Sequence, residues 1–307
     1  MARSTRSITA VLGTHDRALA DRGVAVAVDG TIDAMTDVKE GHELTFDRLL
    51  DIVDELITVK AGSIEAEAAS VFLRKMRYHA SSFSVLWRAP NHLDPFSLLA
   101  LMRIIADCMG TLHHLIDPEI THEEKALRIY VWRLHGLLKR QKFPPSTGQA
   151  RLQIAQESVT IEQLKRCIQN NSLFSSLLES QQNRLLKGKP ETFIIEGQKV
   201  LEIGFGEKLK ALGYGDRYAV HGFAYQSGHI HSGYDAMIQV GQATSSEQLN
   251  ALAAYLPDRL MAMLAKAINV AAKTCPEWAT YTLGLPRIEQ YHLRVLRELG
   301  VQASDVK

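Results

Sequence analysis

Cysteine is scarce in this chain of 307 residues, which has only three, Cys108, Cys167 and Cys275. They lie far apart, and no two of them form a C-x-x-C pair. An odd number of distant cysteines argues against a disulfide framework and against a zinc ribbon. Each cysteine is therefore expected to be a small buried apolar residue, not a reactive thiol.

The chain also lacks an excess of charge of either sign. It has 35 Lys and Arg against 34 Asp and Glu, a formal net charge of +1. No overall field therefore favours binding to nucleic acid or to an anionic membrane, although a local basic patch stays compatible with this balance.

Long apolar runs are missing as well. The two most apolar segments, 96–110 and 249–272, are interrupted by charged residues, and neither reaches about 18 apolar residues in a row. The apolar stretch near the N-terminus, Ile8–Leu12, is too short for a secretory signal. We therefore expect no transmembrane helix, no membrane partner and a cytoplasmic location.

The common nucleotide and hydrolase signatures are absent. The sequence has no Walker loop, no G-x-G-x-x-G, no G-x-S-x-G and no H-E-x-x-H. Gly204-Phe205-Gly206 lacks the third glycine of a dinucleotide-binding turn. The sequence therefore indicates no cofactor.

Helical periodicity dominates what is present, in a chain with 46% hydrophobic and 22% charged residues, typical of a folded globular protein. Apolar residues recur every three or four positions from Thr45 onward, and Thr121 can cap a helix with Glu124 at the capping-box position. Two short β-branched runs around Gly197 predict a small hairpin near 193–203. The predicted fold is an all-α multi-helix bundle with this hairpin.

The helices are expected at 45–57, 63–78, 96–115, 121–142, 148–170, 172–187, 207–212, 216–231, 245–273 and 287–299. The helix over 245–273 has Pro257 inside it, which favours a kink or a restart there. We divide the chain into an N-terminal segment (1–44), a helical core domain (45–272) and a C-terminal helical extension (273–307).

The segment 217–235, RYAVHGFAYQSGHIHSGYD, has the densest set of chemically active side chains. On a helix, Ser227 and His231 share one face and Tyr225 lies on an adjacent face. A hydroxyl four residues before an imidazole can fix its tautomer for acid–base catalysis. The alternative is that these polar groups only satisfy one another between packed helices.

A metal site in this segment is a further alternative. It would use His229 and His231 with Asp235. Two histidines two residues apart point to different sides of a helix, so they could converge only if the helix ends between them.

A second candidate pattern is Arg128-IYVWRL-His135, in which the two ends lie about two helical turns apart on roughly one face. The guanidinium could hold a phosphate while the imidazole moves a proton. The alternative is that Arg128 is an ordinary solvated helix charge. Elsewhere, Arg103 and Asp107 have the spacing of a helical ion pair.

Two blocks resemble an uncharacterised bacterial family of all-helical domains of unknown function. They are SLLALMRIIADCMGTLHHLID…EEKALRIYVWRLHGLLK and EKLKALGYGDRYAVHGFAYQSGHIHSG. The second is similar to a family signature in which a tyrosine-bearing helix precedes Ser-x-x-x-His and a small residue, here Tyr225, Ser227, His231 and Ser232. The resemblance covers roughly 45–272 and implies no established activity.

The chain also resembles the HEPN superfamily of helical bundles. Many members are metal-independent ribonucleases with Arg, four to six residues, then His, acting across a dimer. This resemblance implies a homodimer in which His135 would move the proton of a ribose 2′-hydroxyl and Arg128 would stabilise the phosphorane.

Three functions are compatible with these observations. The preferred one is a HEPN-like effector acting on RNA or a nucleotide, with His231, Ser227, Tyr225, Arg128 and His135 near the site. The second is a non-catalytic interaction or sensor subunit, which would bind a protein partner through an exposed apolar patch. The third is a metal-dependent hydrolase.

Overall fold

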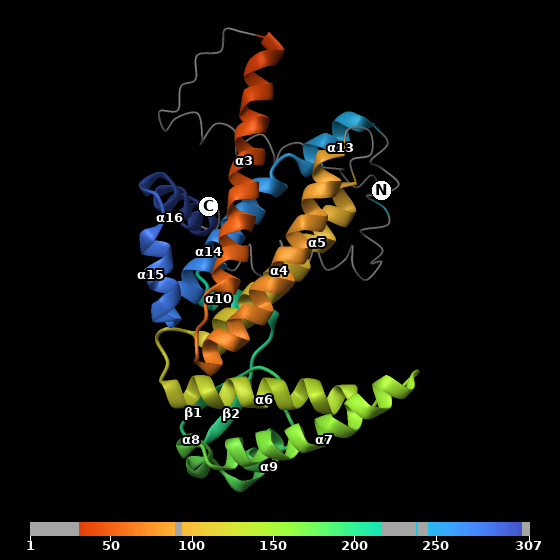
Figure 1. The fold of residues 1–307 in the computed structure, drawn as a ribbon, viewed down its shortest axis with the longest axis vertical. Helices are drawn as coiled ribbons and strands as arrows, with labels where there is room; N and C mark the ends of the chain where they lie inside the picture. The colour runs from red at the N-terminus through yellow and green to blue at the C-terminus, as the bar shows by residue number, and fades with distance from the viewer. Residues whose placement is uncertain (1–30, 90–93, 216–237, 239–244, 303–307) are drawn as a thin grey trace, which may run out of the picture. The chain divides into compact units, whose positions relative to one another are not determined.

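The computed structural model describes residues 31–89, 94–215, 238 and 245–302 (Figure 1). These residues form 12 helices and one two-stranded antiparallel hairpin, which confirms the predicted fold class. The chain divides into two compact units, Met1–Glu43 and Leu44–Lys307.

The main core is built around α5 (Pro95–Ile116), which packs against α4 (Ile64–Arg88) and α14 (Leu256–Thr274). Asp94 caps α5 by accepting from the backbone N–H groups of Phe96 and Ser97. The core includes the predicted apolar face of α3 (Thr31–Thr58), of which Phe46 and Val53 are fully buried. α10 (Phe205–Ala211), α13 (Ser246–Ala253), α15 (Pro276–Gly284) and α16 (Arg287–Gln302) complete this part.

Among the described helices, α5 alone is long and apolar enough to cross a membrane by length and composition. Its most apolar window is 61% buried inside the protein, and the core helix of a folded bundle meets the same criteria. The interruptions noted in the sequence, Arg103 and Asp107, both belong to this helix.

A second cluster of buried residues forms where α6 (His122–Arg140) packs against α7 (Gly148–Gln169) and the hairpin. In the hairpin, β1 (Phe193–Glu196) pairs with β2 (Lys199–Glu202), with Ile194 opposite Leu201. Gly197 makes the turn with a φ of +61°, a conformation that glycine adopts without strain. Phe193 is fully buried and joins the hairpin to this cluster.

Several predicted boundaries were wrong or incomplete. The helix expected over 172–187 is two helices, α8 (Ser172–Ser176) and α9 (Glu179–Leu185), because Leu177 is extended and buried between them. The restart expected at Pro257 within 245–273 is confirmed, because α13 ends at Ala253 and α14 begins at Leu256, with Pro257 in its first turn, where a missing N–H does no harm. α15 was not predicted, and the helix expected over 216–231 lies outside the described residues.

The expected ion pair between Arg103 and Asp107 does not form. Asp107 pairs with Lys208 of α10, with 3.2 Å between Oδ1 and Nζ, and the Arg103 guanidinium lies 3.4 Å from the centre of the Phe205 ring. Both residues therefore attach α10 to α5. The prediction for the cysteines holds for Cys108 and Cys275, which are buried, but is wrong for Cys167, which is exposed on α7.

Candidate functional site

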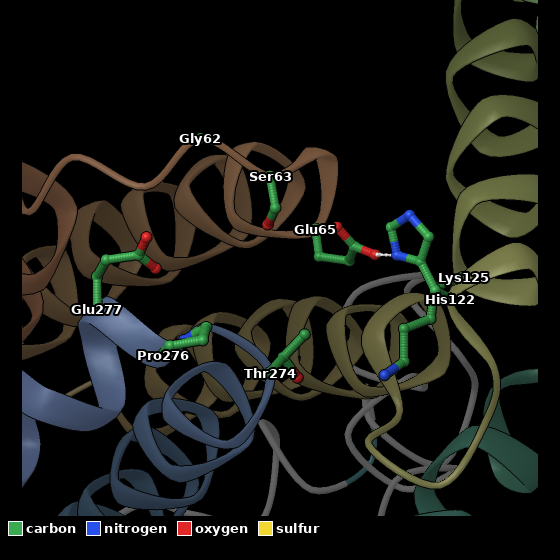
Figure 2. Close-up of a pocket in the computed structure, with 8 residues that line it drawn as sticks. All are labelled: Gly62, Ser63, Glu65, His122, Lys125, Thr274, Pro276 and Glu277. Atoms are coloured by element: carbon green, nitrogen blue, oxygen red, sulfur yellow. Dashed lines mark ion pairs between the residues drawn. The ribbon is translucent and has the colours of Figure 1, made fainter.

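A pocket of about 370 Å³ lies where three helices begin, α4, α6 and α15 (Figure 2). Backbone N–H groups that lack helical partners give the first turn of each helix a partial positive charge. Such helix N-termini favour anionic ligands. The pocket is lined by Gly62, Ser63, Glu65, His122, Lys125, Thr274, Pro276 and Glu277.

A carboxylate–imidazole pair is the central feature of this pocket. Glu65 Oε1 lies 2.6 Å from Nδ1 of His122, as the dashed line in Figure 2 marks. The Glu65 side chain is only 4% exposed, whereas that of His122 is 71% exposed. With Nδ1–H donating to the carboxylate, Nε2 of the neutral ring carries the lone pair and can accept a proton.

The other carboxylate oxygen of Glu65, Oε2, is buried and has no hydrogen-bond partner among the described residues. A buried polar atom without a partner costs roughly 1–3 kcal/mol.

Local capping explains how these side chains are placed. Thr121 caps α6 by accepting from the N–H of Glu124, as the sequence predicts, but the Glu124 carboxylate binds Arg128 and does not complete a capping box. His122 therefore begins α6, and Lys125 follows three residues later on a neighbouring position of the same face. On α4, Ser63 caps the helix and Glu65 lies in its acidic first turn.

The remaining wall has no activated nucleophile among the residues that line it. The Thr274 hydroxyl donates to the carbonyl oxygen of Ile116. The Cys275 thiol, beside the pocket, donates to Oε2 of Glu277 at 3.0 Å. Burial, and to a smaller extent this hydrogen bond, raises the pKa of the thiol. The pocket thus combines a proton acceptor, an ammonium group and positive helix ends, and the attacking group would have to come from the ligand or from water.

The structure gives Arg128 a different environment from the one expected. Arg128 is only 5% exposed. Its guanidinium donates to the His114 carbonyl oxygen at 2.7 Å and to a Glu124 carboxylate oxygen at 2.5 Å. The interpretation of Arg128 as a solvated helix charge is therefore wrong. Burial and the neighbouring Arg128 charge lower the pKa of His114 to about 2, so that ring is neutral. Nε2 of His114 accepts from the N–H of Phe193.

His135 lies two turns further along α6, and its Nδ1 is 2.9 Å from the carbonyl oxygen of Gly188. Its Nε2 is 3.4 Å from the Glu191 carboxylate. Seven residues of helix separate it from Arg128 by about 10 Å, and no hydrogen bond or ion pair joins the two side chains. The catalytic roles assigned to Arg128 and His135 stay predictions.

The other predicted catalytic residues, Tyr225, Ser227 and His231, lie outside the described residues, and so does the alternative metal set with His229. Their roles stay predictions as well. Within the part of the chain that the structure describes, no group of three or more His, Cys, Asp or Glu side chains is arranged to hold a metal ion.

Sequence reasoning missed the pair formed by Glu65 and His122. It identified Ser63 and Thr121 only as helix starts, and no local spacing connects residues so far apart in the chain. The available signal was that each follows a capping residue by one or two positions, so both stand at helix N-termini.

Comparison with known proteins adds no further constraint, because no protein family, curated protein or solved structure matches the chain. Of the two resemblances noted in the sequence, the structure supports the all-helical fold alone.

Proposed function

We propose that this protein is a metal-independent ribonuclease that uses His122, oriented by Glu65, to move the proton of a ribose 2′-hydroxyl. The observation that carries the proposal is the 2.6 Å contact between a buried carboxylate and an exposed imidazole at the mouth of a pocket. An imidazole held in this way is suited to general acid–base catalysis near neutral pH.

The proposed reaction is an intramolecular transphosphorylation. Nε2 of His122 accepts the 2′-hydroxyl proton while the 2′-oxygen forms a bond to phosphorus and the bond from phosphorus to the 5′-oxygen breaks. The leaving 5′-oxygen then takes a proton from the imidazolium. The products are a 2′,3′-cyclic phosphate and a 5′-hydroxyl, and no metal ion or nucleophile from the protein is required.

A phosphate ester in this pocket would face one ammonium group and three helix N-termini, beside the two carboxylates of Glu65 and Glu277. Lys125 and the N-termini of α4, α6 and α15 would stabilise the negative charge that develops on the phosphorane. A volume of about 370 Å³ is near the lower end for ligand sites and suits one linkage of a single strand.

This proposal keeps the reaction implied by the HEPN resemblance but moves its proton acceptor. Arg128 is buried and bonded to His114 and Glu124, so a phosphate would have to displace those bonds to reach it. The pocket at His122 is open to a ligand without such rearrangement. His135 and His231 remain the alternative positions for the reacting imidazole.

The test is cleavage of mixed-sequence RNA by the purified protein with and without EDTA. We expect EDTA-resistant cleavage that ends in a 2′,3′-cyclic phosphate and disappears when the substrate carries 2′-deoxyribose. His122→Asn should lower the rate by roughly 10²–10⁴-fold, the usual contribution of a positioned acid–base group. Glu65→Gln should lower it less, since the amide can still accept from Nδ1–H.

His292→Asn is the matched control, because His292 is also an exposed helix histidine. It should leave the rate unchanged. Full activity in His122→Asn together with loss in His135→Asn or His231→Asn would move the reaction to one of the predicted sites. No cleavage by any folded protein would refute the ribonuclease proposal.

A second candidate, the interaction subunit, is favoured by exposed apolar residues on α7. Leu152 and Val159 lie two turns apart on one helix face and are 63% and 62% exposed. If the chain forms homodimers through this face, Leu152→Asp should lower the mass measured by light scattering from dimer to monomer. An unchanged mass in the variant would exclude this face from self-association.

A further inference from the structure

A second cavity, of about 570 Å³, lies at the end of α5, between α14 and α16. It shares no lining residue with the pocket at His122. Half of its twelve lining residues are charged: Lys266 and Lys273 from α14, Arg297 and Glu298 from α16, and Asp117 and Glu119 from the turn after α5. Arg297 and Glu298 form an exposed ion pair at 3.4 Å.

Lys266 is the unusual residue of this cavity. It is only 7% exposed, its ammonium donates to the carbonyl oxygen of Leu212, and Nζ lies 4.6 Å from the centre of the Tyr214 ring. No carboxylate lies within ion-pair distance of Lys266 in the part of the chain that the structure describes. After burial, the positive charge of Arg297 is what lowers the pKa of Lys266.

An ammonium in this position is costly for the protein. Burial removes it from water, and the neighbouring guanidinium repels it, so its pKa falls to about 8. Buried charges in proteins are usually paired with an opposite charge. A ligand anion in the cavity would provide the missing counter-charge.

The cavity is also lined by carboxylates, which would bind donor groups of a ligand. Asp117 and Glu119 can accept hydrogen bonds, and both carboxylates act electrostatically on His113. Nδ1 of His113 is buried without a hydrogen-bond partner among the described residues. A ligand that reaches these carboxylates would therefore need donor groups as well as an anionic end.

We propose that this cavity binds a small organic acid, with its anionic oxygens against Lys266 and Arg297 and a hydroxyl or amino group towards Asp117 and Glu119. The site is separate from the proposed ribonuclease pocket and does not depend on that activity. Its ligand class is a carboxylate or phosphate compound that also carries hydrogen-bond donors.

The test is a titration of the full chain with four probes, in which binding is measured as the rise of the thermal unfolding midpoint. The probes are inorganic phosphate, succinate, malate and aspartate, of which malate carries a hydroxyl and aspartate an amino group. We expect malate or aspartate to raise the midpoint more than succinate does, and the comparison with phosphate distinguishes carboxylate from phosphate recognition. Lys266→Met should weaken binding about tenfold or more, the effect of losing a charge-assisted hydrogen bond.

Lys273→Met is the matched control, because Lys273 is an exposed lysine lining the same cavity. It should change the affinity much less than Lys266→Met. Lys266→Gln, which keeps a donor without the charge, provides a second variant at the same position. Equal midpoint shifts in the parent protein and both Lys266 variants, or no shift with any probe, would overturn the proposal.

Discussion

Replacing Lys266 by methionine should make the protein without ligand more stable at neutral pH. The two side chains have similar length, so methionine can fill the same space between α14 and its neighbours without a charge. The pKa of Lys266 falls from 10.5 to about 8 in the folded protein. At 1.36 kcal/mol for each pH unit, this difference corresponds to about 3 kcal/mol of destabilisation by the charged amine.

One contact offsets part of this gain. The ammonium donates to the carbonyl oxygen of Leu212, and its removal leaves that buried acceptor without this bond, at a cost of about 1 kcal/mol. The net expectation for Lys266→Met at pH 7 is therefore an increase of about 2 kcal/mol in the free energy of unfolding.

The pH dependence identifies the cause. Between about pH 8 and pH 10.5, the unfolded chain binds a proton at Lys266 that the folded protein has lost, so the stability of the parent rises across this range. The methionine variant has no such group, and its advantage should shrink over the same range. Lys266 also acts on His113, but burial lowers the pKa of that ring from its ordinary value of 6.5, so its titration falls below the range from pH 8 to pH 10.5.

Urea unfolding followed by circular dichroism at pH 7, 9 and 10.5 measures this difference. Lys273→Met, at an exposed position, should change stability by less than about 0.5 kcal/mol. A methionine variant at position 266 that is less stable than the parent by the same amount at every pH would refute the reasoning, because a loss that does not depend on pH means that the pKa of Lys266 is the same in the folded and the unfolded chain.

Three further predictions concern described residues outside the two pockets. Arg128→Leu removes a buried guanidinium from Glu124 and should lower the free energy of unfolding by about 3–5 kcal/mol in urea titrations. Gly188→Ala should be more destabilising than Gly197→Ala in the same assay. Both glycines have positive φ, but only at Gly188 would the new Cβ lie 2.8 Å from backbone. Iodoacetamide at pH 8 should alkylate Cys167 and spare Cys108, whose pKa burial raises to about 11, as mass spectrometry of peptides can check.

The helical fold was predictable because its signals are local. The spacing of apolar residues from Thr45, the caps at Ser63 and Thr121, and the turn at Gly197 each act within a few residues. These signals depend on backbone geometry, so they hold without knowledge of the tertiary contacts. The break at Leu177 was missed because burial of that side chain, a tertiary effect, overrides the helical pattern.

The candidate sites were not predictable for the opposite reason. Glu65 meets His122 only because α4 and α6 begin at the same place. Asp107 was expected to pair with Arg103 on its own helix, but its carboxylate forms an ion pair with Lys208, which lies far away in the chain. Local spacing shows which contacts a helix permits, but competition from other segments decides which of them form.

The pocket at His122 is assembled from three segments that are distant in the chain, since its walls come from the starts of α4, α6 and α15. Each segment supplies only one side of the pocket. The pocket therefore exists only when all three segments are folded and packed together. A chain whose α15 has detached would keep most of its helix content and the contact between Glu65 and His122, but it would lose Glu277 and one positive helix end. Loss of a ligand from this pocket should accordingly precede the loss of the far-ultraviolet helical signal during gradual unfolding.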